Sequence, residues 1–160
     1  MSKLGVVENT LFVPMLGRIY AAEHCPQILY DKKALESKNR LPLDLIEQNM
    51  QNQYTLLASA SRSANMDRII RDFLERRPDG VIVQLGCGLE TTYHRCDNGK
   101  THWYAVNLSH VIEYRRGLLP EPEREFYISG DAFVKEWIIK VRNDVLLCGF
   151  SGRIGSKDRG

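Results

Sequence analysis

The stretch that decides the fold is residues 79–92, D-G-V-I-V-Q-L-G-C-G-L-E-T-T. It opens with the β-branched and apolar run Val81–Leu85, which is typical of a buried parallel strand. The run ends at Gly86 and Gly88, two glycines that let the backbone turn sharply and approach a ligand without a Cβ in the way. In an open parallel sheet this turn lies at the carboxyl edge of the strand, where nucleotide-like ligands bind. A glycine pair alone is a weak motif, so its surroundings have to decide what it binds.

The residues before this strand are predicted to be helical. Apolar side chains recur there at helical spacing, in residues 10–30, 42–54, 56–64 and 69–77. Pro78 follows the last of these segments, where a helix is expected to end. We therefore expect residues 1–78 to form an N-terminal helical cap and a lead-in helix.

After the strand, the pattern changes to alternating strands and helices. Strands are predicted at residues 81–85, 102–106, 125–129 and 145–148, with helices at 89–94, 109–119 and 134–141. This order favours an α/β fold with a Rossmann-like parallel sheet and right-handed crossovers, preceded by the helical cap. Residues 79–149 would form this partial core. Residues 150–160 contain three glycines and no apolar period, so we expect a disordered tail there.

The length and composition are those of one soluble globular domain. Of 160 residues, 43% are hydrophobic and 26% charged, with a formal net charge of +2 and both signs interleaved, so we expect no nucleic-acid partner. There is neither an apolar run of membrane-spanning length nor a signal-peptide pattern, so we expect no membrane partner and a cytoplasmic location. The cysteines lack C-x-x-C spacing, which favours free thiols over disulfides or a metal site: Cys25, Cys87, Cys96 and Cys148.

The residue about 20 positions after the glycines is the next candidate for ligand binding. In a nucleotide-binding sheet an acidic residue there, at the tip of the second strand, accepts the ribose hydroxyls. Here the position holds Asn107, whose amide can accept one hydrogen bond and donate another but lacks a carboxylate's charge. A simple loop or capping role explains Asn107 equally well.

The glycine turn itself favours one class of ligand over another. A dinucleotide-binding turn has a third glycine, but this chain has Thr91 there. Glu90, at the start of the predicted helix, would also repel a pyrophosphate. Both residues disfavour a nicotinamide-dependent oxidoreductase. They favour a ligand without phosphates that carries a sulfonium, an adenosine and an amino-acid tail, which describes S-adenosylmethionine.

Several stretches together resemble a known family. They are S-A-S-R-S-A-N-M-D-R-I-I, V-Q-L-G-C-G-L-E-T-T-Y-H-R, W-Y-A-V-N-L, L-L-P-E-P-E-R-E-F-Y-I-S-G and E-W-I, and the resemblance spans about residues 10–141. In combination they look like the leucine carboxyl methyltransferase-related branch of the class I methyltransferases, which includes bacterial polyketide-type O-methyltransferases. The resemblance implies a partial class I methyltransferase fold and S-adenosylmethionine as cofactor.

The resemblance also implies roles for individual residues. Arg62 matches the arginine that pairs with the cofactor's methionine carboxylate, while Gly86 and Gly88 match the turn beneath the methionine and ribose. Asn107 occupies the place of the ribose-binding aspartate. Asp131 approximately matches the carboxylate at the adenine amino group. The alternatives from the residues alone are an ion pair with Asp67 for Arg62 and a helix cap for Asp131.

The expected activity is therefore S-adenosylmethionine-dependent methyl transfer to a carboxylate or hydroxyl of a small molecule or peptide. After Val141 the sequence departs from the family pattern, and the family's later strands are not found. The alternative is accordingly a truncated, non-catalytic remnant that at most binds the cofactor, and whether the chain is an enzyme stays open. We expect His94, His102 and His110 to be surface or structural residues rather than catalytic bases.

Overall fold

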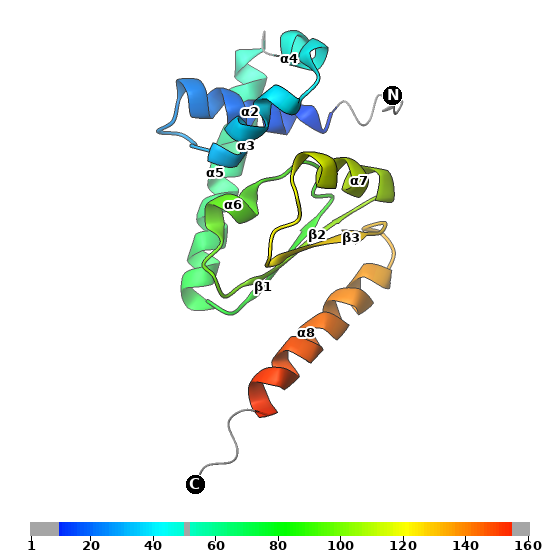
Figure 1. Ribbon diagram of the computed structural model, residues 1–160. Helices are drawn as coiled ribbons and strands as arrows, with labels where there is room; N and C mark the ends of the chain where they lie inside the picture. Colours follow the sequence, from blue (N-terminus) through cyan, green and yellow to red (C-terminus); the bar gives the residue numbers. More distant parts are fainter. Residues whose placement is uncertain (1–9, 50–51, 155–160) are drawn as a thin grey trace.

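The computed structural model describes residues 10–49 and 52–154 (Figure 1). Its helices are α2 (Phe12–His24), α3 (Lys32–Ser37), the 3₁₀ helix η1 (Lys38–Arg40), α4 (Leu43–Asn49), α5 (Gln53–Arg76), α6 (Thr92–Cys96), α7 (Ser109–Leu118) and α8 (Glu136–Ile154). Its strands are β1 (Val81–Leu85), β2 (His102–Asn107) and β3 (Glu125–Ser129). A parallel sheet preceded by a helical region confirms the predicted α/β class.

The sheet has the order β1-β2-β3, and both strand pairs are parallel. The central strand β2 is buried from Trp103 to Val106, as expected for a strand paired on both sides. Two strands have their predicted bounds, and β2 runs one residue further, to Asn107. β1 lies at an edge of the sheet, where Leu85 is 50% exposed.

The turns at the carboxyl edge of the sheet are tied to the end of β2. Gly86 and Gly88 have φ angles of +63° and +48°, a left-handed conformation that favours glycine. Beyond β1, the N–H of Cys87 donates to Val106 O at 3.2 Å. Beyond β3, the N–H of Gly130 donates to Asn107 O at 2.9 Å. The segments that carry Gly86, Gly88, Asn107 and Asp131 therefore meet at one edge of the sheet.

The cap is built on the contact between α2 and α5. The helices approach so closely at Gly17 that a Cβ there would lie 2.7 Å from Leu56 O. The apolar face of α2 is fully buried in the resulting core, through Phe12, Met15, Leu16 and Ile19. Each such side chain contributes about 1.5–3 kcal/mol by its burial. In Figure 1, α5 continues from this cap down to the sheet, so one long helix joins the two layers.

Alternate side chains of β2 face opposite layers of helices. Trp103 packs edge-on against Tyr93 of α6, with ring centroids 5.8 Å apart. On the other face, the hydroxyl of Tyr104 donates to Asp144 Oδ2 of α8 at 2.6 Å. Helices α6 and α8 therefore lie on opposite faces of the sheet, as Figure 1 shows.

The predicted fourth strand, residues 145–148, is wrong, because α8 continues through this segment. A short apolar run cannot be assigned to strand or helix by periodicity alone, and no proline or glycine separates it from the helix before it. Within the predicted tail, residues 150–160, the first residues continue α8, which ends at Ile154. Residues 155–160 lie outside the described part of the chain.

Several predicted helices differ from the observed ones in their bounds. Residues 56–64 and 69–77 form the single helix α5, since nothing between them breaks a helix. The helix after the glycine turn begins at Thr92 rather than at residue 89. The N–H of Glu90 donates to Cys87 O at 2.9 Å, which keeps the preceding residues in a turn.

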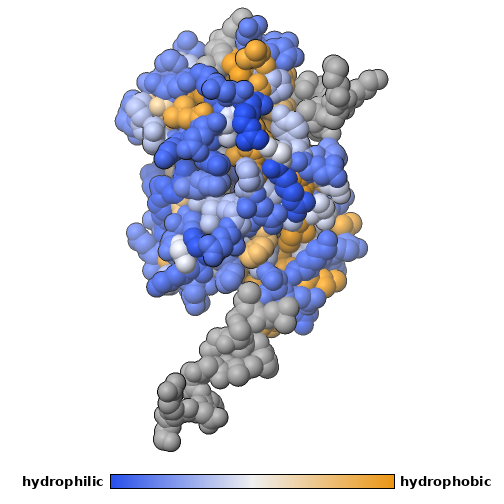
Figure 2. All heavy atoms as spheres, in the orientation of Figure 1, coloured by the Kyte–Doolittle hydropathy of each residue, from blue (hydrophilic) through white to orange (hydrophobic). Residues whose placement is uncertain are grey.

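None of the described helices combines the length and the apolar character needed to cross a membrane. The face of the molecule in Figure 2 is mainly hydrophilic, with separate hydrophobic areas over the helical cap and beside the start of α8.

Candidate functional site

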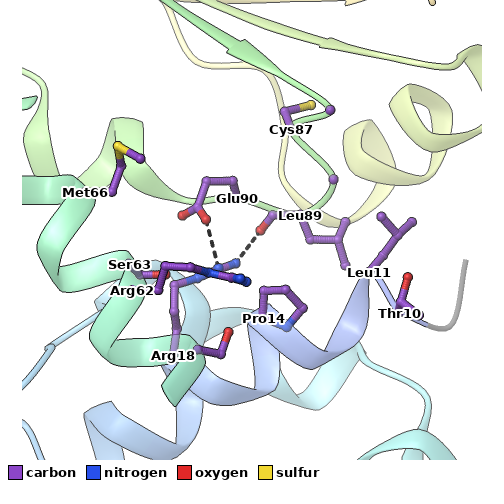
Figure 3. A pocket seen from close by; sticks show the side chains of 13 residues that line it. Thr10, Leu11, Pro14, Arg18, Arg62, Ser63, Met66, Cys87, Leu89 and Glu90 are labelled. Atoms are coloured by element: carbon purple, nitrogen blue, oxygen red, sulfur yellow. Dashed lines mark hydrogen bonds and ion pairs between the residues drawn. The ribbon is translucent and has the colours of Figure 1, made fainter. Parts of the chain in front are cut away.

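A cavity of about 280 Å³ lies between the cap and the glycine turn (Figure 3). Three segments line it: the start of α2, the middle of α5, and residues 86–90 of the turn. The lining residues are Thr10, Leu11, Pro14, Arg18, Ser59, Arg62, Ser63, Met66, Gly86, Cys87, Gly88, Leu89 and Glu90. Three of the five predicted site residues, Arg62, Gly86 and Gly88, are therefore brought together at one cavity.

Arg62 presents a positive charge to this cavity. Its side chain extends from α5 toward the turn (Figure 3), and it has no hydrogen bond or ion pair within the described residues. The alternative partner, Asp67, pairs instead with Arg95, whose Nε and Nη2 lie 2.7 Å and 2.9 Å from its two oxygens. The guanidinium of Arg62 is thus available for an anionic group in the cavity.

The glycine turn leaves little room for additional atoms on the side of α2. A Cβ on Gly88 would lie 3.1 Å from Leu11 Cδ2, closer than an ordinary van der Waals contact. At Gly86 the space is open, and only the positive φ requires glycine. Gly88 therefore serves both the conformation of the turn and the close approach of the cap.

Arg18, which the sequence analysis did not single out, fastens the cap to the turn. It is fully buried, and its Nη2 donates to Leu89 O at 2.7 Å. Its Nη1 donates to Glu90 Oε2 at 3.0 Å, and its Nε lies 3.4 Å from Asp31 Oδ2. Burial lowers the pKa of its guanidinium. In the sequence, the only indication of this role is a charged residue within the apolar pattern of a helix.

Arg95 joins the same charged cluster from α6. Its guanidinium nitrogens lie 2.5 Å from Asp31, 2.7 Å from Asp67 and 3.1 Å from Glu90. Burial raises the pKa of Glu90, but the charges of Arg18 and Arg95 outweigh this effect and lower that pKa to about 2. The negative charge of Glu90 is therefore offset by two arginines, and Glu90 lies before α6 rather than inside it. Its repulsion of a phosphate is weaker than the sequence alone predicts.

The two other predicted site residues lie at the same sheet edge but outside the lining of the cavity. Asn107 ends β2, and its Oδ1 accepts from Leu108 N at 2.8 Å. Asp131 is exposed after β3, and its Oδ1 accepts from Phe133 N at 2.9 Å, the local turn-forming role of this residue type. Their roles toward a ligand remain predictions.

The described residues that line the cavity offer no ready base or nucleophile. None of the chain's four histidines is among its lining residues. Burial and the nearby Lys33 lower the pKa of His94 to about 4, so this imidazole is neutral at pH 7. Burial raises the pKa of Cys87 to about 11 despite Arg115, so its thiol stays protonated. Among the described residues, no group of three or more His, Cys, Asp or Glu could hold a metal ion.

Comparison with known proteins finds a distant relative. Over 137 residues the chain is 26% identical to the tetracenomycin polyketide synthesis O-methyltransferase TcmP of Streptomyces glaucescens. The match covers 85% of this chain and 50% of TcmP, so the chain spans about half the length of this curated relative. No family model and no solved structure matches the chain. The distant homology confirms the resemblance to a polyketide-type O-methyltransferase.

Proposed function

We propose that this chain binds S-adenosylmethionine in the cavity beside the glycine turn and supplies the cofactor-binding part of an O-methyltransferase. The observation that carries the proposal is Arg62, whose guanidinium faces the cavity without an ion pair among the described residues. An unpaired arginine next to two positive-φ glycines suits an amino-acid carboxylate attached to a bulky ligand. The homology to TcmP supports the same assignment.

Each site residue has a distinct role in this proposal. Arg62 pairs with the cofactor's carboxylate, and Gly86 and Gly88 admit the methionine and ribose groups. Asn107 would hydrogen-bond a ribose hydroxyl at the tip of β2, and Asp131 would accept from the adenine amino group. Asn107 offers a weaker contact than a carboxylate would, because it carries no charge.

The proposed reaction is transfer of a methyl group to an oxygen. When bound, S-adenosylmethionine would supply an activated methyl group: the bond between its sulfur and that methyl would break as the acceptor oxygen bonds to the methyl carbon, and S-adenosylhomocysteine would leave. The chain's task is to hold donor and acceptor in line, which is a matter of proximity and orientation. A carboxylate acceptor needs no base, which suits a cavity lined by neither histidine nor thiolate. We propose a carboxylate or hydroxyl of a small molecule or peptide as the acceptor. We also propose a cytoplasmic location, because free thiols are typical of a reducing compartment.

One observation favours binding without catalysis. The described residues form three strands, and α8 occupies the segment in which a fourth strand was expected. In the order β1-β2-β3, strand β1 pairs only with β2, and its outer edge has no partner strand within the described residues. The alternative proposal is therefore a chain that at most binds the cofactor without catalysing methyl transfer.

Thermal unfolding in the presence of ligands tests the proposed function. A ligand that binds only the folded state raises the unfolding midpoint. We expect S-adenosylhomocysteine, the product form of the cofactor, to raise the midpoint of the full chain and NAD to leave it unchanged. A shift with NAD alone would support the oxidoreductase alternative and contradict the proposal.

A further inference from the structure

Two buried arginines hold three successive carbonyl groups of the glycine turn. From α7, Arg115 Nη1 donates to Gly88 O at 3.2 Å and to Glu90 O at 2.7 Å. From α2, on the cap, Arg18 Nη2 donates to Leu89 O at 2.7 Å. Arg18 borders the cavity, but Arg115 does not, so Arg115 holds the turn from behind.

Arg115 is itself fixed by the strands beneath it. Its Nη2 lies 3.0 Å from Glu125 Oε1, and its guanidinium carbon lies 4.6 Å from the centre of the Tyr127 ring. Gln84 of β1 donates to the same oxygen of Glu125 at 3.3 Å. The side chains of Arg115 and Glu125 are both 0% exposed, so water does not compete for their ion pair.

The Arg115–Glu125 pair is poorly arranged for stability alone. Burying two charges carries a desolvation penalty that good geometry and full hydrogen bonding are needed to offset. Here Arg115 Nε and Glu125 Oε2 have no hydrogen-bond partner. The two Nη groups, by contrast, are used for the turn and for Glu125. The arrangement therefore favours a role in holding the turn.

We propose that Arg115 is a positioning residue of the ligand cavity, fixing the carbonyl groups of Gly88 and Glu90 on the side away from the ligand. Because peptide units are planar and trans, a carbonyl held toward Arg115 directs the next residue's N–H to the opposite side of the backbone. Arg115 thereby sets the direction of the Leu89 N–H at the cavity, whereas the Thr91 N–H donates to Glu90 Oε1 at 2.8 Å. This inference rests on the proposed function insofar as it names S-adenosylmethionine as the ligand that depends on the turn.

The test replaces Arg115 without leaving a buried charge unpaired. In the double variant Arg115→Met/Glu125→Gln both charges are removed, and the new glutamine keeps an oxygen that can accept from Gln84. The matched control is Arg116→Met, because Arg116 also lies on α7 near the Tyr127 ring but donates to no carbonyl of the turn. The two readouts are hydrogen exchange of amides 87–91 in the ligand-free protein and calorimetric affinity for S-adenosylhomocysteine.

We expect the double variant to melt cooperatively and to exchange amides 87–91 about tenfold faster, while β2 keeps its protection. Its affinity for S-adenosylhomocysteine falls by about tenfold, whereas Arg116→Met changes neither quantity. Unchanged exchange of the turn in the folded double variant would overturn the inference.

A second variant covers the case in which the double variant does not fold. Arg115→Lys keeps the charge but cannot reproduce the fork that reaches two carbonyls and Glu125. Faster exchange of the turn in folded Arg115→Lys supports the inference, and exchange at the original rate overturns it. If the unsubstituted protein binds no S-adenosylhomocysteine, the proposed function fails, and the exchange of the ligand-free turn still decides the role of Arg115.

Discussion

Arg18 Nη2 and the carbonyl oxygen of Leu89 are joined by a 2.7 Å hydrogen bond, although the two residues lie 71 positions apart in the chain. This bond connects the helical cap to the glycine turn at the border of the cavity. The cap is thus part of the site, because the wall it supplies is fixed to the turn by a buried cation rather than by apolar contact alone.

Substituting Arg18 tests how strongly this connection stabilises the fold. Arg18→Met removes the donor to Leu89 O and leaves Asp31 and Glu90 with one cation fewer. Breaking a buried ion pair from one side costs about 3–5 kcal/mol, so we expect a loss of that order in the free energy of unfolding, measured with urea. Arg68→Met, an exposed change on α5, should leave this free energy nearly unchanged. An equally small loss in Arg18→Met would contradict the role of the bond.

The lowered pKa of Glu90 predicts how stability depends on pH. Its pKa is about 2 in the folded protein, against an ordinary value of 4.5. Because the folded state favours the carboxylate, the stabilisation is complete above pH 4.5 and is lost as the pH falls toward 2. The shift corresponds to at most about 3 kcal/mol.

Urea unfolding of Glu90→Gln at a series of pH values measures this dependence. We expect the variant to be less stable than the unsubstituted protein at pH 7 and the difference to shrink as the pH falls through this window. The two proteins differ only at position 90, so the difference between them isolates the contribution of Glu90. Glu36→Gln is the control, since its carboxylate is half exposed in weak pairs with Lys32 and Lys33. A constant difference across the window would argue against the paired carboxylate.

Alanine substitutions at three glycines should change the stability of the fold by different amounts, with the largest loss at Gly88. Gly88→Ala meets both a positive φ and a contact of 3.1 Å with Leu11, so we expect a loss of about 2 kcal/mol or more. Gly99→Ala meets the positive φ in open space and should cost about 1 kcal/mol. Gly117 lies within α7, with ordinary φ and open space, so alanine there should stabilise by up to about 1 kcal/mol. Thermal unfolding of the three variants checks this order, and an unperturbed Gly88→Ala would contradict the constraint.

The strand, the glycine turn and the α/β order could be predicted because their signals are local. Val81–Leu85 is a compact apolar run, and the two glycines after it mark the turn without reference to distant residues. Residues 145–148 gave a similar apolar signal and form helix instead, because a short run takes the conformation that its neighbours propagate.

The charged residues around the turn could not be predicted in the same way. Arg18, Arg95 and Arg115 each act on partners from other elements, and sequence spacing carries no information on such contacts. For Arg62, the sequence supplied a candidate role by resemblance, and the fold placed it at the cavity with Gly86 and Gly88. Asn107 and Asp131 lie outside that lining, since Asn107 ends β2 and Asp131 follows β3, whereas the lining turn follows β1.

Calorimetric titration of the full chain with S-adenosylhomocysteine tests the central claim most directly. We predict saturable binding by the unsubstituted protein and by the control Arg68→Met. The affinity of Arg62→Met should be lower by about tenfold or more, because a hydrogen bond to a charged group contributes about 1.5–3 kcal/mol. Absence of binding in protein shown to be folded, or equal affinity in Arg62→Met, would contradict the assignment of this cavity to the cofactor.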